Sequence, residues 1–110
     1  MKGTYLGEFE EIVLLAVGIL YDEAYGVSVR AEVERHTGRV ISIGAVHTAL
    51  HRLEEKAFLH SRFGDASDVR GGKRKRLFRI TAEGLQVLRD AQALRSQMWS
   101  LLPKAVLKTI

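Results

Sequence analysis

Residues 42–57, SIGAVHTALHRLEEKA, combine hydrogen-bonding side chains with a spacing that could bring them to an anion. An apolar stripe at helical spacing predicts a helix with one side in the core: Ile43, Val46, Leu50, Leu53 and Ala57. Ser42 can cap this helix, and the free N–H groups of its first turn favour an anion. The other side carries no acid before Glu54. We predict nucleic-acid contacts from Ser42, Gly44, Ala45, His47, Thr48, His51 and Arg52, against the alternative of a solvated surface helix.

A basic hairpin is predicted directly after this helix. Residues 58–63 alternate in polarity, 64–72 (GDASDVRGG) are typical of a turn, and 76–80 alternate again. Six basic residues and no acidic one lie between positions 70 and 79. Such side chains can neutralise phosphates beside a groove, which contributes affinity and register but little sequence information. We therefore predict a wing, with backbone contacts from Arg70, Lys73, Arg74, Lys75 and Arg76.

Two further helices are predicted upstream, and they would position the first one. Residues 6–20 carry apolar side chains on several sides, so we expect burial around most of that helix. Residues 25–36 place Val29 and Val33 inward and the charged residues outward: Arg30, Glu32, Glu34 and Arg35. Thr37 and Gly38 end the second helix, and a short turn leads to Ser42. This is the helix-turn-helix pattern, in which the later helix enters the DNA major groove.

The last predicted helix begins after Thr81, a capping residue, and ends near Leu102 because Pro103 follows. Coiled-coil spacing predicts a dimer seam of Val87, Ala91, Leu94, Met98 and Leu101. A second apolar stripe contains Leu85, Leu88 and Trp99. We expect one face to pack on the chain's own domain and the other on a second subunit; the alternative is that one chain covers both. The residues from Pro103 onward are too few to interpret.

The composition sets the class of protein. With 110 residues, of which 46% are hydrophobic, the chain is expected to form one structural unit with a small core. The net charge of +4 divides into −4 for residues 1–38, +6 for 39–80 and +2 for 81–110, which favours a polyanionic partner for the middle third. The longest apolar run, residues 12–20, is too short to span a bilayer and follows glutamates rather than the basic residues of a signal peptide. We expect no membrane association and a cytoplasmic location.

Enzymatic chemistry is not predicted. The absence of cysteine excludes thiolate catalysis and cysteine-ligated zinc. His47 and His51 are four residues apart and could share a metal, but no carboxylate lies at a spacing that completes a site. The glycines at 71 and 72 lack the strand-to-helix setting of a phosphate-binding loop. We therefore expect no metal, no cofactor and no catalytic residue.

These motifs together resemble the PadR-type transcriptional regulators over about residues 5–90. The resemblance is carried by LGEFEEIVLLAV, AYGVSVR, SIGAVHTALHRLEEK, GGKRKRLFRIT and TAEG. It implies a winged-helix repressor that acts as a homodimer through its C-terminal helix, in the short subgroup with a single such helix. Two residues depart from the family: His47 stands where Tyr is usual, which puts a phosphate contact by that side chain in doubt, and Ala57 stands where Gly is usual. Either a left-handed backbone at Ala57 costs about 1 kcal/mol, or the turn differs.

The resulting expectation is a mostly helical α+β fold: three helices and a two-stranded wing in residues 1–80, then a dimerisation helix and tail in 81–110. The expected partners are a double-stranded DNA operator, a second copy of the chain, and a small aromatic or amphiphilic effector, which similar regulators bind near the dimer interface. Trp99 is the candidate effector contact, unless it is simply packed. A winged-helix module that binds RNA or a protein is the alternative function. RNA binding would use exposed aromatic rings, whereas Phe58, Phe63 and Phe78 are predicted beside core positions.

Overall fold

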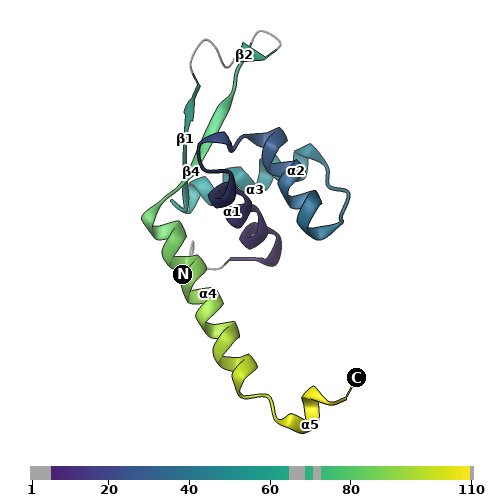
Figure 1. The fold of residues 1–110 in the computed structure, drawn as a ribbon. Helices are drawn as coiled ribbons and strands as arrows, with labels where there is room; N and C mark the ends of the chain where they lie inside the picture. Colours follow the sequence, from purple (N-terminus) through teal and green to yellow (C-terminus); the bar gives the residue numbers. More distant parts are fainter. Residues whose placement is uncertain (1–5, 65–68, 71–72, 110) are drawn as a thin grey trace.

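Three helices form a body from which a β-hairpin and one long helix project in different directions (Figure 1). The computed structural model describes residues 6–64, 69–70 and 73–109. The helices are α1 (Glu8–Leu20), α2 (Gly26–Thr37), α3 (Ile43–Glu55), α4 (Ala82–Ser100) and α5 (Lys104–Leu107), with a 3-10 turn η1 (Tyr21–Glu23). The strands are β1 (Leu59–Phe63), β2 (Val69–Arg70), β3 (Lys73–Arg74) and β4 (Arg76–Ile80). The predicted fold class, a winged helix-turn-helix followed by a C-terminal helix, is confirmed.

The core lies where α1, α2 and α3 meet the base of the hairpin. Its fully buried side chains include Val17 from α1, Val29 from α2 and Leu50 from α3, and Leu59 of β1 closes it from the hairpin side. The apolar stripe predicted on α3 is buried at Val46, Leu50 and Leu53. Ala57 is exposed, and its prediction as part of that stripe is wrong because α3 ends at Glu55.

Two predictions of burial in the first two helices are also wrong. Leu15 and Ile19 of α1 are 45% and 60% exposed, because the body covers only part of that helix. Glu32 of α2 was expected to face outward, yet it is only 3% exposed. Its carboxylate accepts hydrogen bonds from Arg35 at 2.5 Å and from His36 at 2.7 Å, which satisfies the charge inside the protein.

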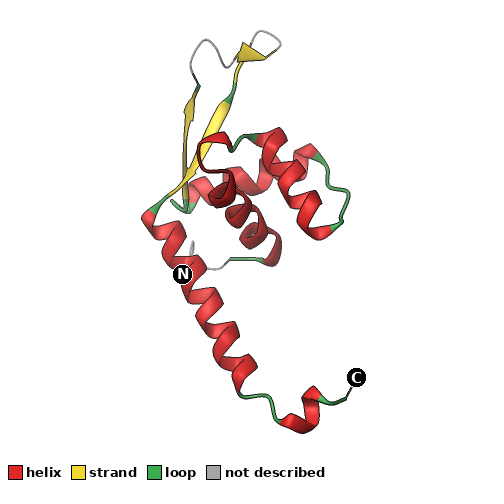
Figure 2. Cartoon of the chain, in the orientation of Figure 1, coloured by secondary structure: helices red, strands yellow, loops and turns green. Residues whose placement is uncertain are grey.

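The hairpin is an antiparallel pair of strands anchored to the body (Figure 2). Leu59 of β1 lies opposite Ile80 of β4, and Phe63 lies opposite Arg76. The backbone N–H of Phe78 donates to the carbonyl of Ala24 at 2.8 Å, so β4 is tied on its other side to the segment before α2. The stretch predicted as a turn contains strand β2, which pairs with β3 and lengthens the hairpin.

The turn that ends α3 carries the family departure at Ala57. Ala57 has φ 66°, a left-handed conformation. Its N–H donates to the Glu54 carbonyl, and the N–H of Phe58 donates to the Leu53 carbonyl, both at 2.9 Å. This is a Schellman motif, whose left-handed position usually holds glycine. Ala57 therefore adopts the left-handed conformation although it lacks the freedom of glycine.

We expect Ala57→Gly to stabilise the protein by about 1 kcal/mol, because glycine adopts positive φ without a Cβ penalty. This corresponds to a rise in melting temperature of roughly 4 °C at fixed protein concentration. Ala31→Gly is a suitable control: Ala31 is exposed within α2, and glycine should destabilise a helix interior. Thermal denaturation followed by circular dichroism measures both. Equal changes in melting temperature for the two variants would contradict the left-handed conformation assigned to Ala57.

Helix α4 is fixed at its first turn and uncovered at its far end. The Thr81 hydroxyl accepts from the Gly84 N–H at 2.9 Å and donates to the Ala57 carbonyl at 2.7 Å, which confirms the predicted cap. Gly84 is buried against the Phe58 carbonyl, where a Cβ would overlap it. Val87 and Leu88 pack on the core, whereas Leu94 and Trp99 are more than half exposed. The body therefore covers the apolar residues near the start of α4 and leaves those toward its end exposed. This differs from the predicted division, in which the body covers one face of the helix.

Within the described residues, no helix combines the length and the hydropathy needed to cross a bilayer.

Candidate nucleic-acid interface

Helix α3 presents the predicted contact residues to solvent. Its inward stripe fixes its rotation, and all seven candidates are exposed: Ser42, Gly44, Ala45, His47, Thr48, His51 and Arg52. The Ser42 hydroxyl accepts from the Ala45 N–H at 3.0 Å, which confirms the predicted cap. The first turn of α3 is thus both capped and accessible from solvent.

One edge of α3 faces the start of α1. A groove there is lined by Thr48 and Arg52 of α3, by Lys56 directly after that helix, and by residues 7–10. Lys56 Nζ lies 2.7 Å from Glu10 Oε1, and this ion pair connects the two helices. Among the described residues, no carboxylate pairs with the Arg52 guanidinium. Arg52 thus has a positive charge available at the groove edge.

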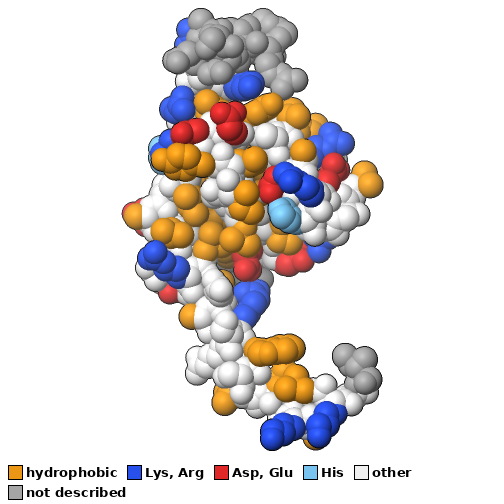
Figure 3. Space-filling model, viewed as in Figure 1, with side chains coloured by type: hydrophobic (Ala, Val, Ile, Leu, Met, Phe, Trp, Pro, Cys, Tyr) orange, Lys and Arg blue, Asp and Glu red, His pale blue; other side chains and the backbone are white. Residues whose placement is uncertain are grey.

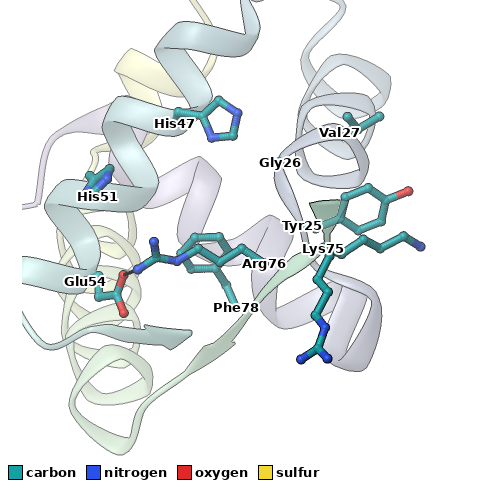
Figure 4. Close-up of a pocket in the computed structure, with 10 residues that line it drawn as sticks. Tyr25, Gly26, Val27, His47, His51, Glu54, Lys75, Arg76 and Phe78 are labelled. Carbon is teal, nitrogen blue, oxygen red and sulfur yellow. Dashed lines mark hydrogen bonds and ion pairs between the residues drawn. The ribbon is translucent and has the colours of Figure 1, made fainter. Parts of the chain in front are cut away.

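The opposite edge of α3 faces the hairpin across a cleft of about 420 Å³ (Figure 4). The α3 side of the cleft carries His47, His51 and Glu54, and the hairpin side carries Lys75 and Arg76. Tyr25 and Val27 at the start of α2 close one end. The cleft combines apolar walls with basic groups from the hairpin and the carboxylate of Glu54 from α3.

His47 is positioned by the small residue opposite it. A Cβ added to Gly26 would lie 2.7 Å from His47 Cε1, so the imidazole rests against the first turn of α2. Figure 4 shows His47 directed toward that turn, with His51 farther along α3. A larger residue at position 26 would therefore displace the His47 imidazole. Whether His47 touches a phosphate stays a prediction.

Arg76 connects the hairpin to α3. Its guanidinium donates to Glu54 Oε1 at 3.1 Å through one terminal N–H, and to Ser61 Oγ at 3.0 Å through Nε. Ser61 in turn donates to Glu54 Oε2 at 2.7 Å. Because Arg76 is already paired, its guanidinium is less available to a phosphate than that of an unpaired arginine. It instead neutralises the first acid of α3 and fixes the hairpin beside that helix.

The remaining predicted wing residues have different surroundings. The Lys75 ammonium lies 4.5 Å from the centre of the Tyr25 ring, and this cation–π contact holds it beside the start of α2. Arg74 is exposed, and no ion pair holds it among the described residues. The side chains of Arg70 and Lys73 lie outside the described part of the chain, so their predicted roles stay predictions.

Three residues near this surface were missed by the sequence analysis: Tyr25, Val27 and Arg39. Tyr25 and Val27 line the cleft, and their position at the start of the second helix was the available signal. Arg39, in the turn before α3, pairs with Glu8 at 2.7 Å. Hydrogen bonds from the Arg39 guanidinium hold the pKa of Glu8 below its usual value, so this carboxylate stays ionised and paired beside the interface.

A helix-turn-helix with an exposed second helix beside a basic hairpin defines the winged-helix class of DNA-binding proteins. The chain belongs to the transcriptional regulator PadR-like family, whose family model matches residues 14–90. This membership implies DNA binding and confirms the resemblance. It also confirms that the protein is not an enzyme, because the family consists of transcriptional regulators.

Comparisons with individual proteins agree with this assignment. A PadR-family regulator from Eggerthella lenta DSM 2243 is 26% identical, with a TM-score of 0.66, over 94% of this chain and 88% of that one. A PadR-like regulator from Bacillus cereus has a TM-score of 0.71 over 93% of both chains; at 17% identity it supports the fold alone. A Lysinibacillus sphaericus protein named "Uncharacterized protein X" is 33% identical over 86 residues, which cover 76% of this chain and 74% of that protein.

Proposed function

We propose that the protein is a homodimeric, cytoplasmic repressor that binds a two-fold operator and is released by a small aromatic or amphiphilic effector. The observation that carries the dimer is the uncovered apolar surface of α4. Leu94, Met98 and Leu101 are 56%, 61% and 73% exposed, and single chains rarely leave such a stripe in water. Residues 1–80 would form the DNA-binding unit, and 81–110 the dimerisation segment.

The proposed DNA contacts divide into two groups. The exposed face of α3 would enter the major groove, with Thr48 and Arg52 at base edges or adjacent phosphates. The basic residues of the hairpin other than Arg76, which is paired with Glu54, would contact the sugar–phosphate backbone. Two copies related by a two-fold axis would place their α3 helices about 34 Å apart, one turn of DNA. The operator would then contain two inverted half-sites.

A mobility-shift comparison tests this function with three nucleic acids: the DNA upstream of the protein's own gene, an unrelated duplex, and single-stranded RNA. We expect tightest binding to the upstream DNA, weaker and strongly salt-dependent binding to the unrelated duplex, and weakest binding to RNA. RNA remains a necessary arm because Phe63 is 62% exposed, contrary to the prediction from sequence. Preference for RNA over both duplexes would overturn the proposal.

The proposed effector contact is Trp99, which is 66% exposed on the uncovered half of α4. An effector can release DNA only if it favours one spacing of the two α3 helices over another. We expect a flat aromatic ligand stacked on Trp99 to quench its fluorescence and to weaken operator binding over the same concentration range. Trp99 is the sole tryptophan, so the signal is specific. Quenching with unchanged operator affinity, or a full response in Trp99→Ala, would contradict this role.

A further inference from the structure

A shallow groove between α1 and α2 is not used by the proposed DNA contacts. It has a volume of about 300 Å³ and is lined mainly by apolar side chains, including Leu15, Ile19 and Val33. Leu15 and Ile19 are large side chains left 45% and 60% exposed. The paired residues Glu32 and His36 form its polar edge. Covering this groove would remove its apolar surface from water, which is favourable.

The C-terminal segment supplies an apolar surface that also lacks a cover. After Pro103 the chain forms α5, in which Val106 and Leu107 are each 49% exposed. The hydrogen bonds described for residues 103–109 all join residues of that segment. Figure 3 shows hydrophobic side chains gathered where α4 bends into α5, away from the body. Among the described residues, this segment is hydrogen-bonded only within itself, and its apolar side chains are exposed.

A single chain cannot bring these two surfaces together while α4 is intact. Helix α4 has 19 residues, which at 1.5 Å per residue span about 28 Å. It packs on the core at Val87 and Leu88 and pairs with α1 through Arg95 and Glu11 at 3.4 Å, and its remaining length carries α5 away from α1 and α2 (Figure 1). A break in its middle would be needed to fold α5 back, with the loss of several backbone hydrogen bonds. An α5 segment that fills the groove must therefore come from another molecule.

A second copy can deliver α5 if the two α4 helices cross antiparallel near Leu94. In that arrangement the C-terminal end of one α4 lies beside the other chain's body, where Leu15 and Ile19 are exposed. A parallel pair would place both α5 segments together at the far end and leave the grooves uncovered. Charge also favours the antiparallel arrangement: residues 1–38 carry −4 and residues 81–110 carry +2, with Lys104 at the start of α5 and Lys108 directly after it.

We propose that α5 of a second copy docks in the groove between α1 and α2, with Val106 and Leu107 against Leu15 and Ile19. The contact rests on the proposed homodimer and occurs twice in it by symmetry. The Lys56–Glu10 pair connects α1 to the end of α3. Docking of α5 on α1 therefore helps to set the position of each α3 relative to the other chain. The residues after Pro103 would thus be part of the dimer, not a free tail.

Disulfide trapping tests the contact, and the cysteine-free chain suits it. We would make Ile19→Cys and Leu107→Cys separately, mix them under conditions that allow subunit exchange, and oxidise the mixture. The expected product is a covalent heterodimer on a non-reducing gel, because docking brings the two positions within disulfide range. The matched control replaces Ile19→Cys with Val40→Cys, which is 95% exposed in the turn before α3.

Three outcomes would overturn docking in trans. The first is no more heterodimer than with the Val40→Cys control. The second is predominant linkage of Leu107→Cys to itself, which would mean that the two C-terminal segments meet each other. The third is linkage within one chain when Ile19→Cys and Leu107→Cys are combined. Light scattering on the unmodified protein separates the proposals: a dimer without the cross-link overturns only the docking, whereas a monomer overturns the homodimer itself.

A charge in α5 gives an independent measurement. Leu107→Asp is expected to raise the dimer dissociation Kd about tenfold or more, since the change acts at both copies of the contact. Thr109→Asp introduces the same charge at an exposed position of the same segment and is expected to change Kd much less. Equal effects of the two variants would show that charge alone, and not the Leu107 contact, determines dimer stability.

Discussion

Leu94→Glu is expected to convert the protein from a dimer to a monomer at micromolar concentration. Leu94 lies at the middle of the proposed seam and is 56% exposed in the single chain. In a two-fold interface the substitution places two carboxylates close together without partners. A buried unpaired charge costs about 2–5 kcal/mol at an interface. Light scattering measures the mass directly.

The same variant should lose most of its operator affinity. Binding of the second half-site becomes intermolecular when the dimer is lost, which is expected to weaken binding by roughly 10²–10⁴-fold. Ala93→Glu is the matched control, because Ala93 is exposed on α4 outside both apolar stripes. It adds the same charge and should leave both the mass and the affinity unchanged. A Leu94→Glu protein that stays dimeric would contradict the assignment of the seam.

Arg52→Ala is expected to weaken operator binding by about 1–3 kcal/mol, if the guanidinium contacts a base edge. Arg52 is exposed on α3, and no carboxylate pairs with it in the described part of the chain. Its loss should reduce the preference for operator over random DNA. Competition mobility shifts with both duplexes measure this preference. Equal losses on the two DNAs would instead assign Arg52 to a phosphate.

Arg74→Ala provides the contrast, because Arg74 lies on the hairpin and is proposed to contact backbone. It should weaken operator and random DNA alike and reduce the dependence of log K on log salt by about one unit. Arg89→Ala removes the same charge from exposed α4, away from the proposed interface, and should change neither quantity. A loss of specificity in Arg74→Ala would mean that the hairpin, as well as α3, recognises sequence.

The sequence by itself determined the order of the elements and the inward face of α3. Apolar periodicity is a local property, so Val46, Leu50 and Leu53 were assigned to the core without knowledge of what covers them. Capping is equally local, and the hydrogen bonds at Ser42 and Thr81 were predicted from residue type and position. The basic hairpin followed from alternation and composition. These local patterns, taken together, were therefore sufficient to predict a DNA-binding protein.

Tertiary structure alone decided which side chains are available at the candidate site. Arg76 and Lys75 are neighbours in a basic run, yet Arg76 pairs with Glu54, 22 positions earlier, while Lys75 lies over Tyr25. Periodicity likewise shows that a helix face is apolar, but not how far another element covers it. Periodicity therefore did not reveal that Ile19 is exposed or that Glu32 is buried. Such outcomes depend on contacts between residues distant in sequence, and these are fixed only when the helices pack.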